Sequence, residues 1–226
     1  MQILIKFPTR SRPEKFLQVL NTYVDLLEEP ENTKFLITCD DDDLTMNNPE
    51  LLGKLEKFIQ NNNLQIKFGK NRNKIEAVNS DVDSCEFDIL LLASDDMIPQ
   101  QFGYDTIIRQ NFKKFFPDTD GVLWFNDGYQ EDRLNTLCIL GKKYYDRFGY
   151  IYHKSYVSLW CDTEFTEVSK MLNKVKYIPH TIIKHEHPVW LGQEWDDLQK
   201  KNDSFNNTDM NNFLKRKKNN FDLKQD

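Results

Sequence analysis

The sequence predicts an α/β domain with a mostly parallel central sheet flanked by helices, and three observations support this fold class. The chain has 226 residues, 39% of them hydrophobic and 29% charged, a composition that excludes a disordered or collagen-like protein. Short apolar runs alternate with segments of helical periodicity through the first half, which is the pattern of βαβ units. The apolar run at 87–93 is nearly continuous, as in a strand buried on both faces of a parallel sheet.

The elements of the first half follow one another at regular spacing. Apolar runs predict strands at residues 3–7, 35–39, 64–68 and 87–93. Helical spacing or a capping residue predicts helices at 12–27, 49–59, 73–79 and 101–115. In the first of these helices, the spacing is carried by Phe16, Leu17, Leu20, Val24 and Leu27.

The second half is less regular. Apolar runs predict strands at 121–125, 137–140, 176–178 and 181–184, and Asp162 opens a helix that continues to about Leu172. From Asp203 the chain is polar, with a thin amphipathic helix that ends near Phe221. We expect this C-terminal segment to pack loosely and to be partly disordered at its end.

Composition also limits the function. No apolar run approaches the ~20 residues of a membrane span, and the first residues lack the apolar stretch of a signal peptide. We therefore expect a cytoplasmic protein without a transmembrane segment. The net charge of −6 argues against a nucleic-acid binder, and the basic cluster at 215–218 is interpreted as a solvated helix end.

Carboxylates gather where the predicted strands end. Four aspartates at 40–43 follow the second strand, and Asp95 and Asp96 follow the fourth. Parallel sheets bind ligands outside the carboxyl ends of their strands. Carboxylates are hard oxygen ligands that suit Mg²⁺ or Mn²⁺, and a diphosphate would complete the coordination shell. Asp41 is our choice to hold a nucleoside; a solvated loop or a helix cap is the alternative interpretation.

Basic residues occur at the same edge. Thr9 and Arg10 follow the first strand, and the segment 70–74, which ends in Lys74, follows the third. Positive side chains near a helix start favour phosphate, although a solvated loop has the same composition.

Two further motifs lie in the second half. His185 and His187 are two residues apart on a predicted strand, so both imidazoles face one side and could approach one metal ion. Asp162 stands at a helix start with Glu164 in the first turn, which is typical of a cap or of a general base at a cleft.

In this order, the motifs resemble those of the GT-A nucleotide-sugar glycosyltransferases, in particular the large inverting family 2, over residues 2–190. The best-matching piece is Lys74-x-x-Ala77-x-Asn79 followed by the segment 87–99. The sequence departs from the family pattern at three positions. Asn73 stands where the family often has Gly, Ala93 replaces the first Asp of its Asp-x-Asp motif, and Cys161 replaces the Glu of its Glu-Asp motif.

The resemblance implies a GT-A fold, a UDP- or GDP-sugar donor, a glycan or glycoconjugate acceptor, and Mn²⁺ or Mg²⁺ as cofactor. It implies that Asp162 is the catalytic base, with Glu164 in reserve. The residues implied to hold the donor are Thr9, Arg10, Asp41, Lys74, Asp95 and Asp96. The residues implied to hold the metal are Asp95 or Asp96, with His185 or His187.

The resemblance also implies the domain organisation: one domain at 1–200, with a donor half at 1–100 and an acceptor half at 101–200, followed by a polar tail at 201–226. One base on the face opposite the leaving group is enough for inversion, and the sequence offers no second candidate nucleophile.

Two alternatives remain open. A sugar-phosphate nucleotidyltransferase would share the nucleotide site, but the turn at 8–13 contains no Gly. A catalytically silent module that binds sugar nucleotides or glycans is favoured slightly by Ala93.

Overall fold

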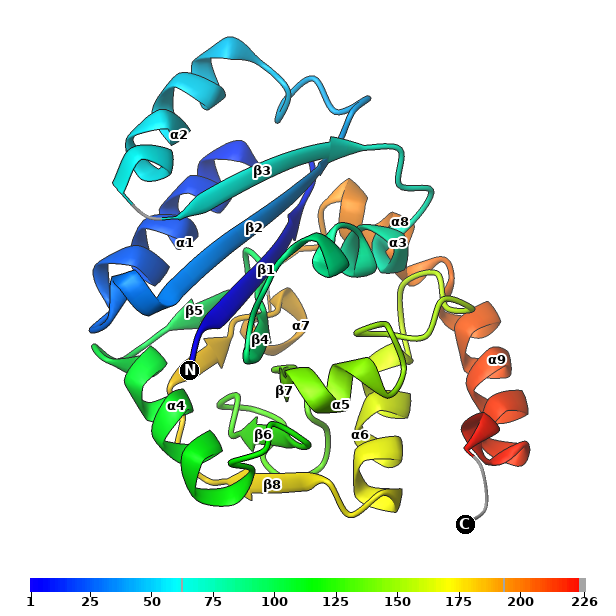
Figure 1. The fold of residues 1–226 in the computed structure, drawn as a ribbon. Helices are drawn as coiled ribbons and strands as arrows, with labels where there is room; N and C mark the ends of the chain where they lie inside the picture. Colours follow the sequence, from blue (N-terminus) through cyan, green and yellow to red (C-terminus); the bar gives the residue numbers. More distant parts are fainter. Residues whose placement is uncertain (62, 193, 224–226) are drawn as a thin grey trace.

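A seven-stranded sheet runs through the described residues, 1–61, 63–192 and 194–223, of the computed structural model (Figure 1). The strand order is β3-β2-β1-β4-β7-β6-β8. The bounds are Ile3–Thr9 (β1), Thr33–Asp40 (β2), Leu64–Gly69 (β3), Ile89–Leu92 (β4), Val122–Phe125 (β6), Ile139–Gly141 (β7) and Val175–Ile178 (β8). β1 to β4 pair in parallel, β7 is antiparallel to both its neighbours, and β8 is parallel to β6. The predicted mostly parallel sheet is therefore confirmed.

Helices cover both faces of this sheet (Figure 1). Their bounds are Pro13–Asp25 (α1), Pro49–Asn61 (α2), Lys74–Asn79 (α3), Tyr104–Phe115 (α4), Lys142–Asp146 (α5), Cys161–Met171 (α6), Pro188–Leu191 (α7), Asp197–Asp203 (α8) and Asn206–Lys218 (α9). Short 3₁₀ turns lie at Pro30–Asn32, Val82–Ser84 and Asn220–Asp222. Side chains alternate across a strand, so Ile3 and Ile5 of β1 pack with α1, α2 and α4, while Leu4 packs with α3, α5, α6 and α9.

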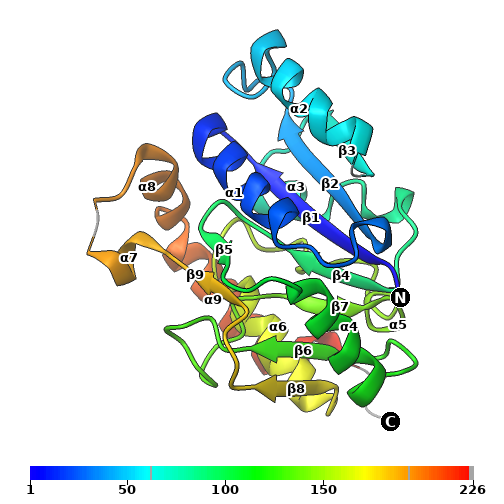
Figure 2. The same cartoon turned by 90° about the vertical axis from the view of Figure 1, so that its left-hand side faces the viewer.

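A second, two-stranded sheet lies beside the main one. β5 (Met97–Pro99) pairs antiparallel with β9 (Ile183–His185), which sets Met97 opposite His185. β5 is not predicted from the sequence, because three residues after two aspartates carry too little periodicity to be distinguished from a turn. In Figure 2, α7 and α8 extend from β9 at the edge of the molecule.

The C-terminal segment packs closely, and the expectation of loose packing is wrong for the described residues. Asp209, Phe213, Arg216 and Phe221 are all buried. Three of these lie on one face of α9, which packs against α6. The expected disorder falls on residues 224–226, which lie outside the described residues.

None of the helices in the described ranges combines the length and the apolar character that a membrane crossing requires.

Candidate functional site

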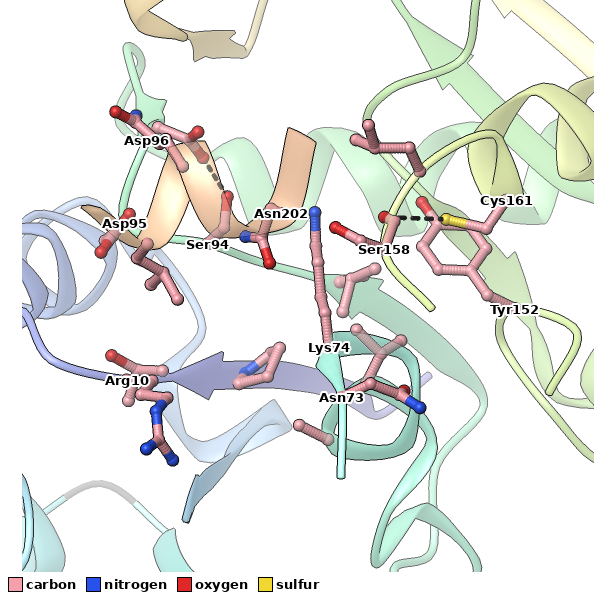
Figure 3. A pocket seen from close by; sticks show the side chains of 18 of the residues that line it. Arg10, Asn73, Lys74, Ser94, Asp95, Asp96, Tyr152, Ser158, Cys161 and Asn202 are labelled. Carbon is pink, nitrogen blue, oxygen red and sulfur yellow. Dashed lines mark hydrogen bonds between the residues drawn. The ribbon is translucent and has the colours of Figure 1, made fainter. Parts of the chain in front are cut away.

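A cavity of about 580 Å³ lies at the carboxyl edge of the sheet (Figure 3). The ends of β1, β2 and β4 form one side, and the starts of α3 and α6 together with α8 form the rest. The volume suits a small-molecule site, and the position is the one where parallel sheets bind ligands. Of the residues proposed from the sequence, the cavity is lined by Thr9, Arg10, Lys74, Asp95, Asp96, Asp162, His185 and His187.

Arg10 is fixed between two carboxylates at one end of the cavity. Its Nη1 lies 2.6 Å from Oδ2 of Asp40 and 2.6 Å from Oδ1 of Asp42. Hydrogen bonds to Asp42 and Asp40 raise the pKa of the guanidinium. Asn71 donates to the other oxygen of Asp40 at 2.9 Å. The end of β2 therefore presents a rigid group of amide, carboxylate and guanidinium.

The structure corrects the choice of Asp41. Its side chain is exposed and is not part of the cavity lining, whereas Asp40 and Asp42 both are. The backbone N–H of Asp41 donates to the carbonyl of Gly69 at 3.0 Å, which continues the pairing between β2 and β3. Because side chains alternate along a strand, Asp40 and Asp42 share one side and Asp41 takes the other.

Lys74 extends into the middle of the cavity (Figure 3). It is the first residue of α3, and Asn73 caps this helix by accepting from the N–H of Glu76 at 3.0 Å. Arg10 and Arg12 are held in ion pairs, but no residue in the described ranges forms one with Lys74. Its ammonium is therefore available to a negatively charged ligand.

Asp95 is paired with a cation that the sequence does not single out. Nη1 of Arg12 lies 2.9 Å from Oδ1 of Asp95, and Nη2 lies 2.6 Å from Asp196. Burial raises the pKa of Asp95 despite the charge of Arg12. Arg12 therefore connects the end of β4 with the start of α8. The positive charge of its guanidinium offsets the negative charge of the Asp95 carboxylate.

Asp96 lies next to His185 instead. Nε2 of His185 is 3.5 Å from Oδ2 of Asp96, and Ser94 donates a hydrogen bond to Oδ1. Burial alone would raise the pKa of Asp96, but the hydrogen bond and charge of His185, with Ser94 and Lys74, lower it. The carboxylate is therefore ionised at neutral pH.

The two histidines differ in their surroundings. Nδ1 of His185 is buried and has no hydrogen-bond partner among the described residues, and a carboxylate oxygen of Asp127 lies 3.9 Å away. Nδ1 of His187 accepts from the N–H of Val189 at 3.3 Å, and burial lowers the pKa of its ring. Nε2 of His185 carries a proton when it faces Asp96 as a hydrogen-bond donor, and it can bind a metal only after this proton leaves, with the ring N–H then at Nδ1.

These donors fit a divalent ion that is bound mainly by its substrate. Asp96 offers a hard carboxylate and His185 an imidazole, a set that Mn²⁺ accepts. Within the described ranges, no cluster of three or more His, Cys, Asp or Glu side chains could hold a metal. A nucleoside diphosphate would therefore have to supply further ligands, as Mg²⁺ and Mn²⁺ commonly require.

Asp162 lies within the first turn of α6, not before it. The helix begins at Cys161, and Trp160 precedes it with a left-handed φ of 62°. Oδ1 of Asp162 accepts from the N–H of Thr163 at 2.8 Å, and the side chain is partly exposed at the cavity. One carboxylate oxygen thus binds a free N–H of the helix start, and the other is available to a ligand.

Glu164, the reserve candidate for the base, is committed elsewhere. Its carboxylate is buried and binds Nε and Nη2 of Arg216 at 2.7 and 2.9 Å. It also accepts from the hydroxyl of Tyr156 at 2.7 Å. Glu164 therefore connects α6 with α9 and is not part of the cavity lining.

Sequence reasoning missed the wall that α8 contributes. Leu198, Gln199, Lys201 and Asn202 line the cavity, and the last two belong to the expected polar tail at 201–226. An available signal was the capping box at Asp196, where Gln199 and Asp196 bind each other's backbone N–H. The sequence also gave no indication of Ser158, a buried residue in the lining.

No protein-family model matches the chain, and no curated protein matches it. Solved structures do match its fold. A mannosyltransferase, PcManGT from Pyrobaculum calidifontis in complex with GDP-Man and Mn²⁺, superposes with a TM-score of 0.64 at 11% identity. That match covers 80% of this chain and 55% of the mannosyltransferase.

S. aureus TarS, in residues 1–349, matches with a TM-score of 0.66 at 13% identity, over 83% of this chain and 61% of TarS. The same protein in complex with UDP-GlcNAc matches with a TM-score of 0.64 at 14% identity, over 81% of this chain and 58% of that one. The chain thus spans little more than half the length of these proteins. Its described residues have the GT-A-like fold of nucleotide-sugar glycosyltransferases.

Proposed function

We propose that this protein is a glycosyltransferase that moves a sugar from a nucleoside-diphosphate sugar to a hydroxyl group of a glycan or glycoconjugate. The observation that carries the proposal is the composition of one cavity. Arg10 and Lys74, the pair Asp96 and His185, and Asp162 all line the same space of about 580 Å³. The matched structures were solved with GDP-Man, UDP-GlcNAc or UDP, which supports a donor of this class.

The donor half of the reaction requires stabilisation of a leaving diphosphate. Lys74 supplies a positive charge in the cavity, and Asp40 with Asn71 offers hydrogen bonds to the nucleoside end. Asp96 and His185 would hold Mn²⁺ or Mg²⁺, which would neutralise charge on the diphosphate. The Mn²⁺ in the mannosyltransferase complex supports this assignment.

The acceptor half requires a base. Asp162 is the carboxylate proposed to take the proton from the acceptor hydroxyl, because one of its oxygens is free and the side chain reaches the cavity. Glu164 is bound to Arg216 and Asp95 to Arg12, so neither competes for this role. One base on the face opposite the leaving group is enough for inversion at the anomeric carbon, so the proposed transfer is inverting. A cytoplasmic location remains a prediction.

Donor binding and turnover test the proposal together. UDP-GlcNAc, UDP-Glc and GDP-Man are offered with and without Mn²⁺, and thermal shift and release of UDP or GDP are measured. At least one donor should raise the Tm of the protein in the presence of Mn²⁺, and the protein should hydrolyse this donor slowly. Absence of binding by every donor would refute it.

One observation favours the second candidate, a silent binding module. Ala93 is buried where the family has an acid, and Asp95 is neutralised by Arg12. Mn²⁺-dependent binding without any release of UDP or GDP, also with glycan acceptors present, would identify such a module.

A further inference from the structure

Ser158 carries a hydroxyl group that lacks a partner in the described structure. The residue is 1% exposed, it lines the cavity, and its Oγ has no hydrogen-bond partner among the described residues. In the view of Figure 3, Ser158 lies on the other side of Lys74 from Arg10 and Asp95. A buried hydroxyl without a partner is destabilising, so native structures nearly always satisfy such a group. A ligand in the cavity could supply the missing partner.

The backbone around Ser158 is held by one buried carboxylate from the C-terminal helix. Asp209 of α9 is fully buried. Its oxygens accept from the N–H groups of Val157, Ser158 and Leu159 at 3.0, 2.8 and 2.8 Å. Hydrogen bonds to a charged acceptor are stronger than neutral ones. Three consecutive N–H groups on one carboxylate therefore leave this backbone segment little freedom, which fixes the direction of the Cα–Cβ bond of Ser158.

The helix that carries Asp209 is itself anchored to the acceptor half. Arg216 binds Glu164 of α6 through two nitrogens, and Trp160 donates its indole N–H to Asn206 at 2.7 Å. α9 thus contacts both the segment that contains Ser158 and the helix that contains Asp162. The polar C-terminal segment is therefore a support of the cavity wall.

We propose that Ser158 hydrogen-bonds a hydroxyl group on the sugar ring of the donor, and that Asp209 is the positioning residue that aims it. The inference rests on the proposed glycosyltransferase function and assigns the wall that faces the transferred sugar. Val157 and Leu159, the residues on either side of Ser158 in the chain, also line the cavity and are uncharged, which suits an uncharged sugar ring. Ser158 also precedes Asp162, the proposed base, by four residues in the chain, and both line the cavity.

The test compares a sugar nucleotide with its nucleoside diphosphate, so that only contacts to the sugar are measured. The donor that binds best among UDP-GlcNAc, UDP-Glc and GDP-Man is titrated with Mn²⁺ by calorimetry, in parallel with UDP or GDP. Ser158→Ala should weaken binding of the sugar nucleotide about three- to tenfold and leave binding of the diphosphate unchanged. Ser155→Ala is the matched control, because Ser155 is exposed and is not part of the cavity lining.

Asp209→Asn tests the positioning role. The amide of this variant would direct its own N–H groups at the backbone N–H groups of residues 157–159, so this segment should shift. Affinity for the sugar nucleotide should then fall while affinity for the diphosphate is kept. In the double variant with Ser158→Ala, the losses should not add. If Asp209→Asn fails to fold, Ser158→Ala alone decides.

Equal losses for sugar nucleotide and diphosphate, or no loss in Ser158→Ala, would overturn the inference while leaving the proposed function intact. Failure of the unaltered protein to bind any of the three donors would overturn the proposed function as well.

Discussion

Nε2 of His185 lies 3.5 Å from Oδ2 of Asp96, and the pairing of β5 with β9 brings them together. The register sets His185 opposite Met97, the residue after Asp96. The N–H of Glu186 also donates to the carbonyl of Asp96 at 2.7 Å. A strand of three residues thus joins a carboxylate that follows β4 to an imidazole at the end of β9.

This relationship predicts where a metal binds. Asp96→Asn and His185→Ala should each weaken Mn²⁺ binding at least about tenfold in the presence of UDP, because each removes one of few protein ligands. Electron paramagnetic resonance of free Mn²⁺ measures the affinity directly. Asp41→Asn is the control, since Asp41 is exposed outside the cavity. Unchanged affinity in both test variants would exclude this pair as the metal site.

Lys74 is predicted to bind the diphosphate through its charge. Lys74→Met should weaken UDP or GDP binding about tenfold or more, the value of a hydrogen bond to a charged group. Lys70→Met removes the same charge from an exposed residue outside the cavity and should have little effect. Calorimetric titration compares the two variants, and similar losses in both would mean that Lys74 acts only through the general field of the protein.

The ion pair of Glu164 with Arg216 is predicted to stabilise the fold. Glu164→Gln should lower the free energy of unfolding by about 2–3 kcal/mol, because it removes the buried carboxylate and leaves the Arg216 guanidinium with only the exposed Asp222 as counter-charge. Glu167→Gln removes a more exposed partner of Lys217 from the same helix and should cost less than about 1 kcal/mol. Urea denaturation measures the unfolding free energy of both variants. Equal losses would show that the buried ion pair stabilises the fold no more than the more exposed one.

Lys6 predicts a pH dependence of stability. Its side chain is buried, and its Nζ donates to the carbonyl of Ser80 at 2.7 Å and to the hydroxyl of Thr38. Burial lowers its pKa from 10.5 to about 8. Between these two values the unfolded chain holds the proton and the folded protein does not. Stability therefore rises with pH in this window, and below pH 8 the full cost of the buried charge remains.

Lys6→Met removes the titrating group with little change in volume. From pH 7 to pH 10, the unaltered protein should gain about 2 kcal/mol in unfolding free energy relative to this variant. Urea denaturation at both pH values gives the difference, in which the titration of other groups cancels. A constant difference would mean that Lys6 keeps an ordinary pKa in the fold.

The order of strands and helices in the first half could be predicted because burial on two faces leaves continuous apolar runs. β4 is the clearest case, since all four of its residues are buried. Short elements are held by partners far away in the sequence and leave no such run. β5 depends on β9, and α8 depends on its capping box and on the contact of Asp196 with Arg12.

The site could be predicted to the level of a segment but not always of a residue. The sequence places four aspartates at 40–43 after β2, and only the alternation of side chains past the end of this strand selects Asp40 and Asp42, which line the cavity, over Asp41. Ser158 could not be found, because its backbone is held by Asp209, which is 51 residues away along the chain.

The measurement that tests the account most directly is the turnover of Asp162→Asn. The amide keeps the size of the side chain and can still accept from the N–H of Thr163, so the fold and the affinity for the sugar nucleotide should be unchanged. Loss of a positioned base should reduce transfer ~10²–10⁴-fold, measured as release of UDP or GDP with Mn²⁺ and an acceptor glycan. Glu167→Gln on the same helix should keep full turnover. Near-normal turnover in Asp162→Asn would contradict the account, because Asp162 is the residue to which it assigns the role of the base.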